Sequence, residues 1–134
     1  MGNMNRLYMS IDKLSAIISF DQLEIPQTVD EVYRIARLYR IDVSAYDVHL
    51  RMDEELLDTA KGYTGGSFDD NEIDLYPLAF ANEETLARTQ FHEVYHQTQY
   101  AEYGYANVVA EHAKYEIITR EAELKWWSDK GWLI

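Results

Sequence analysis

One pentapeptide in this sequence has the residue types and spacing of a metal site: His92-Glu93-Val94-Tyr95-His96, an H-E-x-x-H pattern. Histidines four residues apart lie on one face of an α-helix, so both imidazoles can bind a single metal ion. Glu93 stands beside the first histidine and can accept a proton from a water molecule that the metal activates. We therefore predict a Zn²⁺ site with His92 and His96 as ligands and Glu93 as the catalytic base. The alternative is a pair of partly buried, hydrogen-bonded histidines without a metal.

The third zinc ligand is not determined by the motif, because a site with two histidines needs one more protein ligand and an open position for water. The last predicted helix offers Glu111, Glu116, Glu121 and Glu123. A simple helical hairpin about Gly104 places Glu116 opposite the histidines. In contrast, Glu121 falls in a row spaced as one buried face, and a carboxylate there is costly unless it binds a metal or is paired. That row comprises Ala113, Ile117, Leu124 and Ser128.

The periodicity of the chain predicts an α+β fold in a single domain, residues 1–134. N-terminal helices come first, then a short antiparallel or mixed sheet, then an active-site helix and a C-terminal helix. The predicted segments are helices at 10–20 and 28–40, a strand within 41–52, a glycine-rich hairpin turning at 69–71 with its second strand through Ile73 and Leu75, a helix from Asn82 or Glu83 to Gly104, and a helix at 107–129. In the active-site helix we expect an apolar stripe of Ala87, Phe91, Val94, Tyr95 and Thr98, with the two histidines beside it.

Charge and composition exclude several classes of protein. With 24 acidic and 12 basic residues the formal charge is −12, which disfavours direct binding of nucleic acid. No stretch reaches the roughly 18–20 apolar residues that cross a bilayer, and we see no export signal. Cysteine is absent, in keeping with a cytoplasmic location. Between Lys61 and Arg88 the chain has acidic residues and no basic one, which indicates a solvated acidic face or a surface for a basic partner.

Residues 28–134 resemble the ImmA/IrrE type of small metallopeptidase within the zincin superfamily. The resemblance rests on the segments VDEVYRIARLY, NEIDLYP, EETLARTQFHEVYH and REAELKWWSDKGWLI, in this order. It implies a zincin-like fold with zinc as cofactor, and it matches Glu121 to the third ligand and Trp127 to a packed aromatic. Together with the expected burial, it ranks Glu121 above Glu116.

The function that follows is a zinc-dependent endopeptidase acting on a protein or peptide. The strand from Glu72 to Tyr76 would bind the extended substrate along its edge, and Tyr100, Tyr103, His112 or Tyr115 would stabilise the oxyanion. The resemblance further implies cleavage of one regulatory protein, for example the repressor of a phage or mobile element. The alternative is an acidic binding protein of phage type that occupies a basic surface, with a structural or inactive metal motif.

Overall fold

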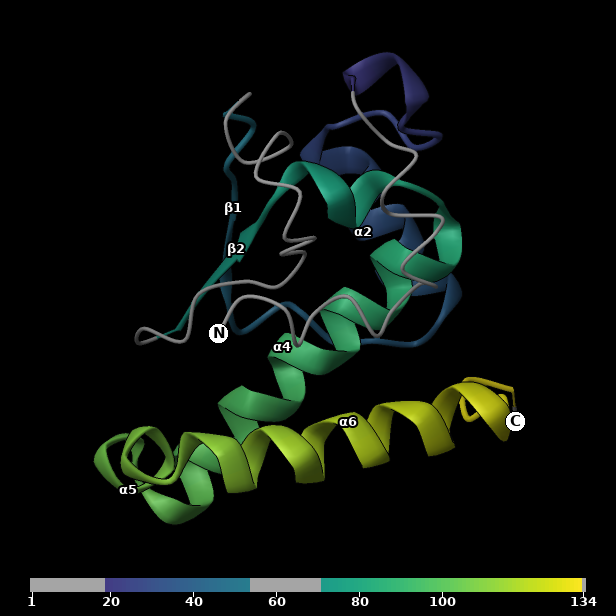
Figure 1. Ribbon diagram of the computed structural model, residues 1–134. Coiled ribbons are helices and arrows are strands. Elements are labelled where there is room, and N and C mark those ends of the chain that lie inside the picture. The colour runs from purple at the N-terminus through teal and green to yellow at the C-terminus, as the bar shows by residue number, and fades with distance from the viewer. Residues whose placement is uncertain (1–18, 54–70, 134) are drawn as a thin grey trace.

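The computed structural model describes residues 19–53 and 71–133, in which helices pack against a small sheet (Figure 1). The elements are η2 (Phe20–Gln22), α2 (Val29–Leu38), β1 (Asp47–Leu50), β2 (Glu72–Leu75), η3 (Pro77–Phe80), α4 (Glu83–Tyr103), α5 (Tyr105–Ala110) and α6 (His112–Ser128), where η denotes a 3₁₀ helix. This mixture of helices and strands confirms the predicted combination of α and β structure. The predicted helix at 10–20, apart from its last two residues, and the first strand of the predicted hairpin lie outside the described residues.

The two described strands are parallel, with Asp47 paired to Glu72 and Leu50 paired to Leu75. The prediction of an antiparallel sheet is therefore wrong for these strands. Alternating apolar residues indicate which face of a strand is buried, but they carry no information about the direction of the neighbouring strand. Ile73 and Leu75, which point to the same face of β2, are both buried.

The apolar core lies between α2, β2, η3 and the beginning of α4. Thr28 caps α2 by accepting a hydrogen bond from the backbone N–H of Glu31 at 3.2 Å, as expected for an N-cap threonine. The apolar side of this helix is buried through Val32, Ile35 and Ala36. The main core side chains from the other elements are Ile73, Leu75, Leu78, Phe80 and Leu86.

Helices α4 and α6 position the candidate site. Asn82 caps α4 by accepting a hydrogen bond from the backbone N–H of Thr85 at 2.8 Å, and Gly104 ends the helix with a positive φ of 89°. Figure 1 shows α6 running alongside α4, with α5 at the turn between them. The single helix predicted over 107–129 is in fact two, because the backbone of Glu111 leaves the helical conformation between α5 and α6.

The predicted apolar stripe of α4 holds only in part: Ala87 is buried, and Phe91 and Val94 pack against the apolar core, but most buried side chains of this helix are polar. Phe91, Val94 and Tyr95 are only partly buried, and Thr98 is exposed. The buried polar residues of α4 are Thr85, Arg88, Thr89, Gln90, His92, Glu93, His96, Gln97 and Gln99. Buried polar groups require partners. Gln90 and Gln97 donate to backbone oxygens of α2 and β2, whereas Arg88, His92 and His96 meet side chains of α6. No helix in the described ranges is long and apolar enough to cross a membrane.

Candidate metal centre

Helices α4 and α6 bring His92, His96 and Glu116 into one buried cluster. Oε1 of Glu116 lies 3.0 Å from Nε2 of His92 and 2.7 Å from Nε2 of His96. The two Nε2 atoms are 3.2 Å apart. Three atoms that can each bind a metal therefore converge on one point between the helices.

The chemistry and spacing of these three atoms suit zinc. Ligand atoms at 2.0–2.2 Å from a tetrahedral zinc ion lie roughly 3.3–3.6 Å from one another. The observed separations are 2.7–3.2 Å, so accommodating the ion requires the side chains to separate by less than roughly 1 Å. Two imidazoles and one carboxylate are also the protein ligands of several catalytic zinc sites, which leave the fourth position for water.

The outer nitrogen of each imidazole has its own partner. Nδ1 of His92 lies 3.1 Å from Oε1 of Glu123, and Nδ1 of His96 lies 3.0 Å from Oε1 of Gln99. When Nδ1 carries the proton and donates it to these oxygens, the Nε2 lone pair is directed to the shared point. Gln99 is itself held by donating from Nε2 to the backbone oxygen of Tyr115, at 3.3 Å. Both imidazoles are thus oriented as metal ligands usually are.

The carboxylate of Glu123 is neutralised from its other side. Its Oε2 accepts a hydrogen bond from Nε of Arg88 at 2.6 Å, and Nη1 of Arg88 donates to Glu84 at 2.7 Å. Arg88 and Glu123 are both buried, and a buried carboxylate is tolerated when it is paired in this way. A continuous set of interactions therefore runs from Glu84 through Arg88 and Glu123 to His92.

In the metal-free protein, His92 carries a positive charge and Glu116 a negative one. Burial by itself lowers the pKa of His92, but hydrogen bonds to Glu116 and Glu123 outweigh it and raise this pKa from 6.5 to about 10. Burial by itself raises the pKa of Glu116, whereas the two histidines lower it well below its ordinary range. Without a metal, an imidazolium of His92 and a carboxylate of Glu116 therefore form a buried ion pair.

Glu93 lies on the side of α4 next to the histidines. It is buried, and its negative charge contributes to the raised pKa of His92. One residue further along the helix, its side chain is turned about 100° from that of His92. The carboxylate is therefore beside the cluster without belonging to it.

The structure places Glu116, and not the preferred Glu121, beside the histidines. Glu121 lies on the exposed side of α6, about 140° around the helix from Glu116. The burial expected for its row is wrong, because Ile117 and Leu124 are each 48% exposed. The buried residues of α6 are Tyr115, Glu116, Thr119 and Glu123. Apolar spacing misidentified the inner face because α6 packs on the polar face of α4.

Of the residues that support the histidines, sequence reasoning named Glu123 only as a candidate third ligand and singled out neither Arg88 nor Gln99. Their spacing nevertheless follows the helical repeat: Arg88 precedes His92 by four residues, Gln99 follows His96 by three, and Glu123 follows Glu116 by seven. Searching these helices for polar residues in phase with the ligands would have found all three.

Comparison with protein-family models, with curated proteins and with solved structures finds no match for this chain. We therefore base the functional proposal on the geometry of the cluster.

Proposed function

We propose that this protein is a zinc-dependent peptidase whose metal ligands are His92, His96 and Glu116. The observation that carries the proposal is the convergence of the two Nε2 atoms and Oε1 of Glu116 within 3.2 Å of one another. The oriented Nδ1 atoms support it, because an ion pair alone does not require both outer nitrogens to be held.

Each residue has a defined role in this proposal. When bound, zinc lowers the pKa of a water molecule towards about 7 and polarises the carbonyl of the scissile bond. Glu93 accepts a proton from the water molecule as the oxygen of that water bonds to the carbonyl carbon. Glu93 then delivers this proton to the amine nitrogen as the carbon–nitrogen bond breaks. His92, His96 and Glu116 hold their positions throughout.

The substrate in this proposal is an extended segment of a protein. Strand β2 approaches the helix of the metal cluster, where Nε2 of Gln97 donates to the backbone oxygen of Glu72 at 3.4 Å. A peptide running beside this part of the sheet would reach α4 near Glu93. The family resemblance extends the proposal to the cleavage of a specific regulatory protein.

The test compares the wild-type protein with Glu93→Gln, His92→Ala and His96→Ala. After refolding with zinc and desalting, we expect about one zinc ion per chain in wild type and in Glu93→Gln, measured by elemental analysis. The two histidine variants should retain little. Incubation with a proteome-derived peptide library, followed by mass spectrometry, should show cleavage by the wild type alone.

Two results would contradict the proposal. A wild-type protein that retains no zinc lacks the metal site altogether. Equal cleavage by wild type and Glu93→Gln would remove Glu93 from the reaction. An acidic binding protein, by contrast, would bind its basic partner without zinc and would be unaffected by Glu93→Gln.

A further inference from the structure

A peptidase of this kind must stabilise the negative charge that develops on the carbonyl oxygen of its substrate. A positioned hydrogen-bond donor beside the metal serves this purpose, and removing one such donor typically costs about 10²–10³ in kcat. Four residues near the end of α4 and the beginning of α6 have suitable donors: Tyr100, Tyr103, His112 and Tyr115.

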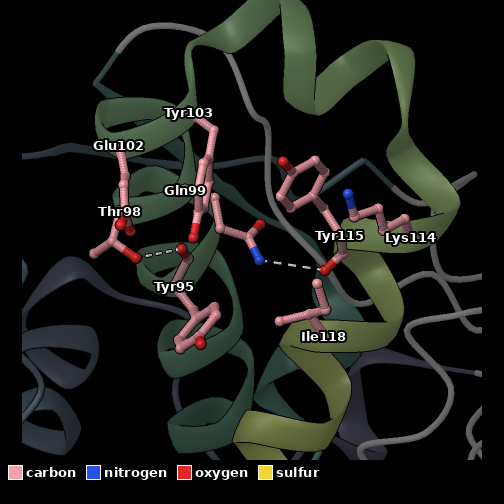
Figure 2. A pocket seen from close by; sticks show the side chains of 8 residues that line it. All are labelled: Tyr95, Thr98, Gln99, Glu102, Tyr103, Lys114, Tyr115 and Ile118. Carbon is pink, nitrogen blue, oxygen red and sulfur yellow. Dashed lines mark hydrogen bonds between the residues drawn. The ribbon is translucent and has the colours of Figure 1, made fainter.

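Tyr103 and Tyr115 line a pocket whose lining does not include Glu93. Their rings pack against each other, with centroids 5.4 Å apart. Figure 2 shows both among the residues that line a pocket of about 250 Å³ between α4 and α6. Tyr95 contributes to the same pocket, and Tyr100, five residues later, points about 140° away from Tyr95 around the helix.

Tyr100 instead lies beside His96, one of the two histidines of the proposed metal site. Its ring is nearly parallel to that of His96, at 17°, with the centroids 6.4 Å apart. Side chains on a helix lean towards its N-terminus, so Tyr100 leans over the preceding turn, which contains His96. An edge contact with Tyr105, at 4.9 Å between centroids and 62° between the ring planes, holds the ring from another direction.

Tyr100 also shares a helical face with the proposed base. It follows Glu93 by seven residues, which places the two side chains within about 20° of each other around α4. His112 lies four residues before Glu116, so it is on the face of α6 that carries Glu116 and not on the face of α4 that carries Glu93. The water and the carbonyl that it attacks must both lie on the side of Glu93, which favours Tyr100.

We propose that the phenolic hydroxyl of Tyr100 donates a hydrogen bond to the carbonyl oxygen of the substrate as this oxygen becomes negative. The inference rests on the proposed function, since it assigns a donor to the same site. A phenol carries its proton at neutral pH and is therefore a donor. It transfers no proton, because Glu93 carries the proton in both steps.

The experiment uses protein loaded with Co²⁺ in place of zinc, because the visible spectrum of the ion reports what binds to it. The probe is N-phosphoryl-leucyl-phenylalanine, whose tetrahedral anion resembles the transition state of peptide hydrolysis. Mercaptoacetate binds through sulfur and is the control ligand. The variants are Tyr100→Phe, with Tyr103→Phe as a matched control from the pocket side of α4, and His112→Gln.

We expect Tyr100→Phe to bind Co²⁺ and mercaptoacetate as the wild type does, because phenylalanine preserves the ring contacts. Its affinity for the phosphoryl dipeptide should fall about tenfold to a hundredfold, as for a lost hydrogen bond to a charged group. Tyr103→Phe and His112→Gln should bind the dipeptide like the wild type.

Unchanged dipeptide affinity in Tyr100→Phe would overturn the assignment, and so would a loss confined to His112→Gln. A wild-type protein that binds Co²⁺ and mercaptoacetate but not the dipeptide would also overturn it, while leaving the metal site intact. Failure of the wild type to bind Co²⁺ would instead reject the proposed function, and this inference with it.

Discussion

Oε1 of Glu123 lies 3.1 Å from Nδ1 of His92, on the opposite side of the imidazole ring from Glu116. One buried carboxylate therefore orients the ring, while the other lies beside the nitrogen available to a metal. The same ring is thus held between two glutamates of α6, seven residues apart. This relationship distinguishes the roles of the glutamates in α6 and leads to the first two predictions.

Glu116→Ala should severely weaken zinc binding, because two imidazoles alone leave the ion mostly bound to water. Glu121→Ala is the matched control, since it removes an exposed glutamate from the same helix and should change stability by no more than about 0.5 kcal/mol. Competition with a chromogenic chelator measures both affinities. Loss of zinc in Glu121→Ala with retention in Glu116→Ala would reverse the assignment.

Glu123→Gln should reduce zinc affinity about tenfold to a hundredfold, although Glu123 does not contact the metal position directly. The reason is that a neutral amide orients His92 less strongly and makes it a weaker ligand. Glu121→Gln again serves as the control. If competition with the chelator gives Glu123→Gln the same zinc affinity as the wild type, the carboxylate of Glu123 has no part in the site.

Zinc binding should release protons at neutral pH. In the metal-free protein, burial lowers the pKa of His92, but the hydrogen bonds to Glu116 and Glu123 outweigh this effect and raise the pKa to about 10. The imidazole is therefore protonated at neutral pH until zinc displaces the proton. Zinc affinity should therefore rise with pH between about 7 and 10. Calorimetric titrations in buffers of different ionisation enthalpy measure the protons released, and a binding enthalpy independent of buffer at pH 7.5 would contradict this protonation state.

Gly104→Ala should destabilise the protein by about 1 kcal/mol or more, because Gly104 has a φ of 89° that a residue with a Cβ adopts only with strain. The added Cβ would make only an ordinary van der Waals contact, with the side chain of Asn107 at 3.7 Å. For a domain of this size the midpoint of thermal unfolding should fall by roughly 2–5 °C per kcal/mol. An unchanged midpoint in calorimetry would show that the backbone here relaxes at no cost.

The ends of α2 and α4 could be predicted from the sequence, because they depend on residues within one turn of the helix end. Thr28 and Asn82 begin helices because their side chains accept backbone N–H groups in the first turn, and Gly104 ends one because it tolerates positive φ. His92 and His96 could be paired for the same kind of reason, since a spacing of four residues puts them on one helical face whatever the rest of the fold.

Three features depended on tertiary structure: the direction of β2 relative to β1, the partners of the histidines, and which glutamate lies beside them. Each is a relation between segments far apart in the chain, and apolar periodicity does not report it. On α6 the periodicity pointed to the wrong face: Ile117 and Leu124 are exposed, while Glu116 and Glu123 are buried against α4. Carboxylates can be buried there because His92, His96 and Arg88 on the facing helix compensate their charge. The sequence of α6 by itself does not show which side chains of another helix will face it.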